Sequence, residues 1–275
     1  MSVRAPSTNF QALETLLVEK PWGRLDLPAG FPSANGKRIG EIEHRAIDGA
    51  PAPLLAKHIF TSERLSIQVH PGDDQARARG LSSGKTECWL ILAAEPGAVI
   101  GIGGNCALTP DALHAAALDG SIEHWLDWRR VAVGDFFLVP AGTIHAIGAG
   151  ITLVEIQQNV AATYRLFDYG RPRALHLGDG VAVAHPAPYP AAFATRVVPG
   201  DTVLADIPQF QIRYRTLPGS FDVDKNCLVI PITGLVTIDG VGAAPGRCFA
   251  ANAFANVHIG PDAAILIARS QSALA

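Results

Sequence analysis

Short apolar runs, each followed within a few residues by glycine, proline or aspartate, recur along most of this 275-residue chain. From residue 54 onward they include LLAKHIF, LSIQVHP, CWLILAA, FFLVPAG and ITLVEIQQ. Runs of this length are typical of β-strands, and the 27 glycines and 20 prolines supply the turns between them. The pattern predicts a mainly β protein built from antiparallel sandwiches or barrels.

Two stretches rich in proline and glycine interrupt this pattern. Residues 1–53 predict an extended lead-in with a short helix over residues 10–17, which covers the molecule without forming a core. Residues 184–199 contain four prolines, enough to stop any regular element, and predict a boundary near Pro186. Strand-like runs then resume as far as AAILIARS. We therefore expect one domain over residues 1–185 and a smaller β domain over residues 186–275.

The spacing of apolar residues changes between Gly104 and Val131. Thr109 is followed by Pro110, which is the order of a helix N-cap and a proline at the first helical position. The segments ALHAAALDG and SIEHWLDW then predict two short helices inserted between strands.

The overall charge and the cysteine pattern exclude several classes of function. A net charge of −3 with no block of Lys or Arg argues against a nucleic-acid partner. The chain has no apolar segment of about 18 residues and no apolar run at its N-terminus, so we expect no membrane partner and a cytoplasmic location. Without a Cys-x-x-Cys pair, the cysteines are expected to be reduced and mostly buried thiols: Cys88, Cys106, Cys227 and Cys248.

Two residue pairs and one turn predict a metal site. Gln68 and His70 lie two residues apart, as do Lys85 and Glu87, and in a strand this spacing puts both side chains of a pair on the same face. The segment GDFFLVPAGTIHAIG reads as a strand, a tight turn and a returning strand that places His145 opposite the first pair across a narrow barrel.

Each of these features alone could be an ordinary polar residue of a strand or turn, but together they offer one set of ligands. The predicted ligands are Gln68, His70, Glu87 and His145. Two imidazoles with carboxylate and amide oxygens favour one Zn²⁺ per chain, although Mn²⁺, Fe²⁺, Co²⁺ or Ni²⁺ would also be accepted. Because thiolates are absent and Lys85 lies alongside, the site is expected to be catalytic.

The ordered motifs LSIQVHP, GKTECW, GDFFLVPAGTIHAIG and EIQQN, followed by YRLFDYGR, resemble the type I mannose-6-phosphate isomerases in their short bacterial form. The match covers roughly residues 20–184. The pattern from Gly134 to His145 is also similar to the second motif of the cupin superfamily. The resemblance implies two cupin-like (jelly-roll) β-barrel domains, with short helices inserted in and before the first, and with the second domain a degenerate cupin that binds no metal.

The resemblance also implies an activity and further site residues. The activity is an aldose–ketose isomerisation between mannose 6-phosphate and fructose 6-phosphate through a metal-stabilised enediolate, with a small hexose phosphate as the partner. The family's ligands fall on the same four positions, and its catalytic residues fall on Lys85, Glu155 and Arg165.

Several alternatives remain open at the level of sequence. The proton could be moved by Glu155, Lys85 or His70, and Arg165 could orient the substrate or instead pair with Asp168 at the surface. A non-catalytic sugar-binding cupin or a cupin dioxygenase would also use this scaffold.

The sequence departs from the family at two positions near these motifs. Many relatives have a Ser-Asp pair after EIQQN, where this chain has Val160-Ala161-Ala162, so the resemblance implies the metal ligands but not the details of substrate binding. His58 also differs from some relatives, and we expect it to be structural.

Overall fold

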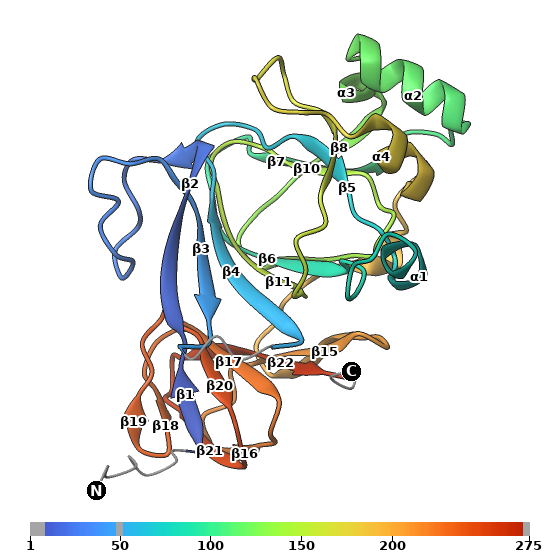
Figure 1. Cartoon of the computed structure of the whole chain (residues 1–275). Coiled ribbons are helices and arrows are strands. Elements are labelled where there is room, and N and C mark those ends of the chain that lie inside the picture. Colours follow the sequence, from blue (N-terminus) through green and yellow to red (C-terminus); the bar gives the residue numbers. More distant parts are fainter. Residues whose placement is uncertain (1–8, 48–51, 272–275) are drawn as a thin grey trace, which may run out of the picture.

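Four antiparallel sheets form the framework of the protein, as seen in a computed structural model that describes residues 9–47 and 52–271 (Figure 1). The prediction of a mainly β chain is confirmed. The two sheets that carry the candidate site come mainly from the first two thirds of the chain, and the other two come mainly from the last third.

The seven-stranded sheet contains, in spatial order, β13 (Ala194–Arg196), β9 (Asp135–Val139), β6 (Glu87–Ala94), β11 (Ile151–Gln158), β4 (Leu54–Phe60), β3 (Ile39–Arg45) and β2 (Glu14–Arg24). The five-stranded sheet contains β12 (Tyr164–Phe167), β5 (Ile67–Val69), β10 (His145–Ile147), β7 (Val99–Gly104) and β8 (Leu126–Arg130). Their facing sides share a core that includes Trp89, Ile91 and Ile102.

The six-stranded sheet contains β1 (Phe10–Ala12), β20 (Phe249–Ala251), β17 (Cys227–Thr233), β22 (Ala264–Ser270), β15 (Phe210–Arg215) and β14 (Asp201–Asp206). The four-stranded sheet contains β16 (Gly219–Val223), β21 (Ala255–Ile259), β18 (Val236–Ile238) and β19 (Val241–Gly242). A second core lies between these two sheets and includes Val229, Ile265 and Val257.

A third core joins the two halves of the molecule. Leu90 of β6 and Ile156 of β11 pack in one cluster with Phe210 and Leu266 from the six-stranded sheet. Strand alternation explains this arrangement, because residues at odd positions of β6 face the site while their neighbours face the second half. The outer face of the central strands of the seven-stranded sheet is therefore buried against the six-stranded sheet.

The helices are short and lie outside the sheets: α1 (Asp73–Arg77), α2 (Pro110–Asp119), α3 (Ile122–Trp125), α4 (Leu177–Val183) and the 3₁₀ turn η1 (Ala191–Phe193). The two predicted inserted helices are confirmed, and the Thr109 side chain accepts a hydrogen bond from the N–H of Ala112 at 3.2 Å. The second of them is shorter than expected, because the chain passes into β8 after Trp125. No helix in the described ranges is long and apolar enough to span a membrane.

The expected N-terminal lead-in is wrong in the described part of residues 1–53. Residues 10–17 form strand β1 and the start of β2 in place of the predicted helix, because β20 and β3 offer them backbone partners. Cross-strand pairing here overrides the helical preference of residues such as Ala, Leu and Glu. Ile39 and Ile42 are fully buried, so this region does form core. Residues 1–8 and 48–51 lie outside the described residues.

The proline-rich stretch also forms regular structure, contrary to prediction. β13 follows three of the four prolines and pairs with β9 of the seven-stranded sheet. Conversely, β1 near the N-terminus pairs with β20 in the C-terminal sheet. The division into residues 1–185 and 186–275 stays a prediction. Both β1 and β13 pair with a strand from the other side of that division.

The four cysteines are free, as expected. Cys88, Cys227 and Cys248 are buried and Cys106 is exposed.

Candidate metal centre

The predicted ligands come together from two facing sheets. Gln68 in β5 and His145 at the start of β10 are direct cross-strand partners, so their side chains share a face. His70 follows the end of β5, and Glu87 begins β6 in the other sheet. His145 is therefore a neighbour of Gln68 within one sheet. The prediction that it lies across the barrel is wrong, and the candidate ligand from the facing sheet is Glu87.

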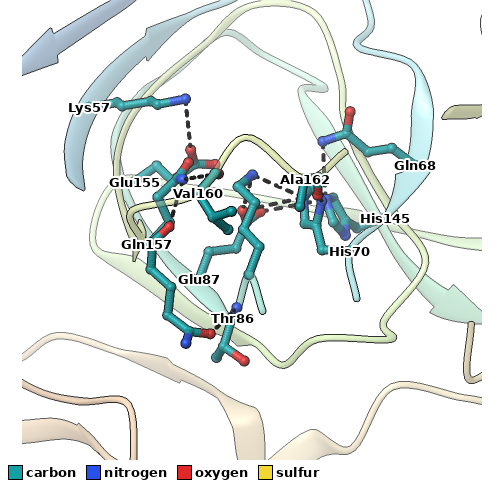
Figure 2. Close-up of polar contacts among 12 residues, drawn as sticks. Lys57, Gln68, His70, Thr86, Glu87, His145, Glu155, Gln157, Val160 and Ala162 are labelled. Atoms are coloured by element: carbon teal, nitrogen blue, oxygen red, sulfur yellow. Dashed lines mark hydrogen bonds and ion pairs between the residues drawn. The ribbon is translucent and has the colours of Figure 1, made fainter. Parts of the chain in front are cut away.

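The Glu87 carboxylate faces the two imidazoles, which lie together on one side of it (Figure 2). Its Oε2 is 3.4 Å from Nε2 of His70, and its Oε1 is 3.5 Å from Nε2 of His145. The potential ligand atoms of these three residues all lie within 4.8 Å of one another, and all three side chains are buried. Gln68 completes the group, with its Nε2 3.2 Å from Nε2 of His145.

Backbone carbonyls orient both imidazoles. Nδ1 of His70 lies 2.7 Å from the oxygen of Ala162, and Nδ1 of His145 lies 2.9 Å from the oxygen of Thr143. Because a carbonyl only accepts, each Nδ1 carries the proton and each Nε2 keeps a lone pair that faces Glu87. Burial lowers the pKa of both rings, that of His145 to about 3, so both are neutral near pH 7.

Glu87 is a fully buried carboxylate, and neither of its oxygens accepts a hydrogen bond of normal geometry. Burial alone would raise its pKa, but the Lys85 ammonium, 2.7 Å from Oε2, holds that pKa well below its usual range. Glu87 is therefore ionised, with lone pairs available to a cation.

The four side chains fit a divalent metal ion. Two neutral imidazole nitrogens, one carboxylate and one amide oxygen form a mixed N/O set without thiolates. The amide oxygen of Gln68 accepts a hydrogen bond from Ser66 at 3.2 Å, and rotation of the amide would turn this oxygen toward the other ligands. Nζ of Lys85 is also 3.0 Å from Nε2 of His70, so the ammonium and a metal ion would share acceptor atoms.

Glu155 lies on the other side of Glu87 from the histidines (Figure 2). Trp89 donates from Nε1 to its Oε2 at 3.1 Å, and Nζ of Lys57 is 3.9 Å from its Oε1. Burial, and then the charge of Glu87, raise the pKa of Glu155 to about 7. This carboxyl can therefore gain or lose a proton near neutral pH.

We expect the raised pKa of Glu155 to make the stability of the metal-free protein depend on pH. Between about pH 4.5, the ordinary value, and about pH 7, the folded chain holds a proton that the unfolded chain releases. The free energy of unfolding should therefore fall as pH rises through this window. Urea denaturation of wild type and Glu155→Gln in a chelating buffer measures this contribution as their difference. Parallel pH dependences for the two proteins would show that Glu155 does not titrate there.

Lys57 is a site residue that the sequence analysis missed. It lies in one cross-strand row with Glu43 and Glu155, and its Nζ is 3.3 Å from Glu41 and 3.4 Å from Glu43. Burial alone would lower the pKa of Lys57, but Glu155 and the other carboxylates raise it above the ordinary value. A lysine inside the apolar strand LLAKHIF was the available signal, because lysine is almost never buried unless it is paired.

Arg165 lies in β12 as the cross-strand partner of Gln68. Its Nε donates to the carbonyl of Ala174 at 3.0 Å. Asp168, the alternative surface partner from the sequence, forms its ion pairs with Arg171 and Arg173. Arg165 is thus placed on the strand next to one of the predicted ligands.

The departure at residues 160–162 involves the backbone of the site. Ala162 contacts His70 through its carbonyl oxygen, and Val160 accepts a hydrogen bond from Gln157 in the same way. The loss of polar side chains there leaves these contacts intact. His58 is buried and hydrogen-bonded to His44 at 2.9 Å, away from the ligand set, which agrees with its structural assignment.

Comparison with curated sequences gives matches that are named mannose-6-phosphate isomerases. A mannose-6-phosphate isomerase of Streptococcus mutans is 37% identical over 196 residues, which cover 66% of this chain and 62% of that protein. The match therefore spans less than two thirds of the relative's length. No protein-family model matches the chain.

Solved structures extend the likeness of fold to nearly the whole chain. The mannose 6-phosphate isomerase of Bacillus subtilis superposes with a TM-score of 0.75 at 24% identity, covering 94% of this chain and 98% of that one. A mannose 6-phosphate isomerase bound with zinc and yttrium gives a TM-score of 0.73 at 13% identity, covering 96% and 100%. The chain is thus similar in sequence to mannose-6-phosphate isomerases over part of their length, and it shares the cupin fold of the solved ones.

Proposed function

We propose that this chain is a metal-dependent isomerase that interconverts mannose 6-phosphate and fructose 6-phosphate. The observation that carries the proposal is the buried carboxylate of Glu87, which faces Nε2 of both histidines and contacts the ammonium of Lys85. The named relatives support the choice of substrate. The cytoplasmic location and the absence of a nucleic-acid partner stay predictions from the sequence.

We infer that the resident metal is Zn²⁺, held by Gln68, His70, Glu87 and His145. The donor set supports this choice, as does the solved relative that contains zinc. When bound, the ion supplies a Lewis acid that stabilises negative charge as it develops on the sugar oxygens.

Glu155 is our candidate for moving the proton between C1 and C2. A general base works best when its pKa is near the working pH, and burial raises that of Glu155 to about 7. His70 donates from Nδ1 to Ala162 and its Nε2 is a ligand, so neither ring nitrogen is free for proton transfer. Trp89 orients one oxygen of Glu155 by its hydrogen bond, and Lys57 lies near the other.

Lys85 and Arg165 would interact with the negative charges of the substrate. The ammonium of Lys85 lies beside Glu87 in the buried site, where a fixed positive charge has the largest effect on a developing oxyanion. The guanidinium of Arg165 is planar and suits two parallel hydrogen bonds to a phosphate or to vicinal oxygens.

Arg165→Ala should leave the bound metal unchanged and weaken substrate use. We expect kcat/KM to fall about tenfold to a hundredfold, because one charged hydrogen-bonding partner of the substrate is lost. Steady-state kinetics with metal analysis of the same sample tests this, and Arg213→Ala, on the solvent-facing part of β15, is the matched control. Unchanged kinetics for Arg165→Ala would remove its assigned role.

The function itself is tested by following purified protein with mannose 6-phosphate. We expect fructose 6-phosphate to form, the reverse reaction to reach the same equilibrium ratio, and unphosphorylated mannose to react far more slowly. NMR detection reports the sugars directly and needs no coupling enzyme. Binding of the hexose phosphate without turnover would overturn the proposal in favour of a sugar-binding protein, and oxygen uptake with bound iron would favour a dioxygenase.

A further inference from the structure

The loop that carries Lys85 is held by hydrogen bonds at successive residues. Residues 82–86 have no helix or strand. The N–H of Gly84 donates to Oδ1 of Asp73 at 2.8 Å, that of Lys85 to the carbonyl of Pro71 at 3.0 Å, and that of Thr86 to Oε1 of Gln158 at 2.9 Å. The backbone of Lys85 is therefore fixed at its own position and on both sides.

The same loop packs directly on the segment that follows His70. A Cβ added at Gly84 would lie 2.6 Å from the carbonyl carbon of Gly72 and 2.7 Å from the nitrogen of Asp73. Only glycine allows so close an approach of two backbones. The position of the Lys85 loop is thereby tied to the position of His70.

Asp73 is the point at which these contacts meet. Besides the N–H of Gly84, its carboxylate accepts hydrogen bonds from Nε2 of Gln158 at 2.9 Å and from Nε2 of Gln209 at 3.2 Å. Gln158 thus bridges Asp73 and Thr86. Burial alone would raise the pKa of Asp73, but the bonds from Gln158, Gly84 and Gln209 hold it below its usual range, so the acceptor is an ionised carboxylate.

Gln209 comes from the C-terminal half of the chain. It lies in the turn between β14 and β15 of the six-stranded sheet, 136 positions from Asp73. Reciprocal backbone bonds of 3.1 Å between Ile207 and Phe210 close this turn, and Phe210 is fully buried in the core between the two halves. The side chain of Gln209 therefore starts from an anchored backbone.

We propose that Asp73, Gln158 and Gln209 form a positioning clamp that holds the Lys85 loop, and that the C-terminal half acts on turnover through Gln209. The clamp places Lys85 beside Glu87 without itself touching the ligand atoms. Its effect on turnover rests on the proposed isomerase function, whereas its effect on loop order does not.

Hydrogen exchange of the peptide covering residues 82–86 measures the order of the loop without any assay of activity. In Asp73→Ala we expect exchange there to speed up about tenfold to a hundredfold, and in Gln209→Ala about tenfold, because hydrogen bonds to a charged acceptor are lost. Gln211→Ala is the matched control, since Gln211 lies on the same hairpin and its side chain donates to the exposed Asp206. It should leave exchange in this peptide unchanged.

Steady-state kinetics of the same variants distinguishes a role in positioning Lys85 from a general loss of stability. Both clamp variants should lower kcat about tenfold while the KM for mannose 6-phosphate and the metal content stay near wild type. Asp73→Asn should restore most of kcat, because its Oδ1 can still accept from Gly84 and Gln158, and its Nδ2 can donate to Gln209 after that amide rotates.

Three results would overturn the clamp. The first is wild-type exchange of residues 82–86 in both Asp73→Ala and Gln209→Ala. The second is faster exchange with unchanged kcat in an active enzyme. The third is an equal loss of kcat in Gln211→Ala. If wild type fails to isomerise mannose 6-phosphate but the exchange results are as expected, the proposed function fails, and the clamp is supported.

Discussion

Replacement of Glu87 by alanine should remove both the metal and the turnover. This residue supplies the only carboxylate of the ligand set, and it faces both histidines. Loss of a residue that merely orients a ligand typically costs tenfold to a hundredfold in metal affinity, so loss of the ligand itself should cost at least about a hundredfold. Metal analysis after gel filtration, with isomerase activity of the same sample, measures both effects.

The Ala variant also leaves the ammonium of Lys85 buried without its carboxylate, which can destabilise the fold. Glu87→Gln keeps the shape of the side chain and separates the two effects, since it should fold and still bind metal weakly. Glu95→Ala, at an exposed position just beyond the same strand, is the control and should retain metal and activity. A folded Glu87→Gln protein with full metal content and full activity would contradict the assigned role.

Replacement of Lys85 by methionine should give the opposite combination, with metal retained and turnover lost. We expect turnover to fall about a hundredfold to ten-thousandfold, the range for a group that transfers a proton or stabilises charge in the reaction. Metal affinity should not fall, because the ammonium competes for Oε2 of Glu87 and Nε2 of His70. Kinetics and zinc titration by calorimetry test the two parts.

The response of Tm to added zinc should also distinguish Lys85→Met from wild type. Without metal, Lys85→Met leaves the Glu87 carboxylate buried without a cation, so added zinc should raise its Tm more than that of wild type. Lys225→Met, at an exposed position in the C-terminal half, should behave as wild type. A Lys85→Met protein with normal turnover would show that Lys85 only balances the charge of Glu87.

The site could be predicted largely because period-2 spacing is a local property of a strand. The pairs Gln68–His70 and Lys85–Glu87 could be found from that spacing alone. His145 could be found from the turn that precedes it. The partners across the sheet could not be predicted in the same way. That Gln68 pairs with His145, and that Glu87 comes from the facing sheet, depends on strand order, which short apolar runs do not encode.

Lys57 shows the same limit for charged residues. Its significance lies in its contacts with Glu41, Glu43 and Glu155, which come from two other strands. Until those strands are aligned, LLAKHIF reads only as one more apolar run. The spacing rules could therefore find ligands on one strand but not an ion network across three.

The fold was predictable where local chemistry decides it and less so where distant pairing does. The helix starting at Pro110 follows from its N-cap Thr109. By contrast, residues 10–12 are a strand because β20, more than two hundred residues away, offers its edge. The prolines before β13 likewise stop a helix or strand only locally, and Ala194–Arg196 can still pair with β9.

Titration of the metal-stripped protein with zinc, with conversion of mannose 6-phosphate followed at each addition, tests the central claim most directly. A catalytic ion held by Gln68, His70, Glu87 and His145 predicts negligible activity in the stripped protein, followed by a linear rise that ends at about one equivalent per chain. Full activity in thoroughly stripped protein, or zinc binding at one equivalent with no turnover, would contradict it.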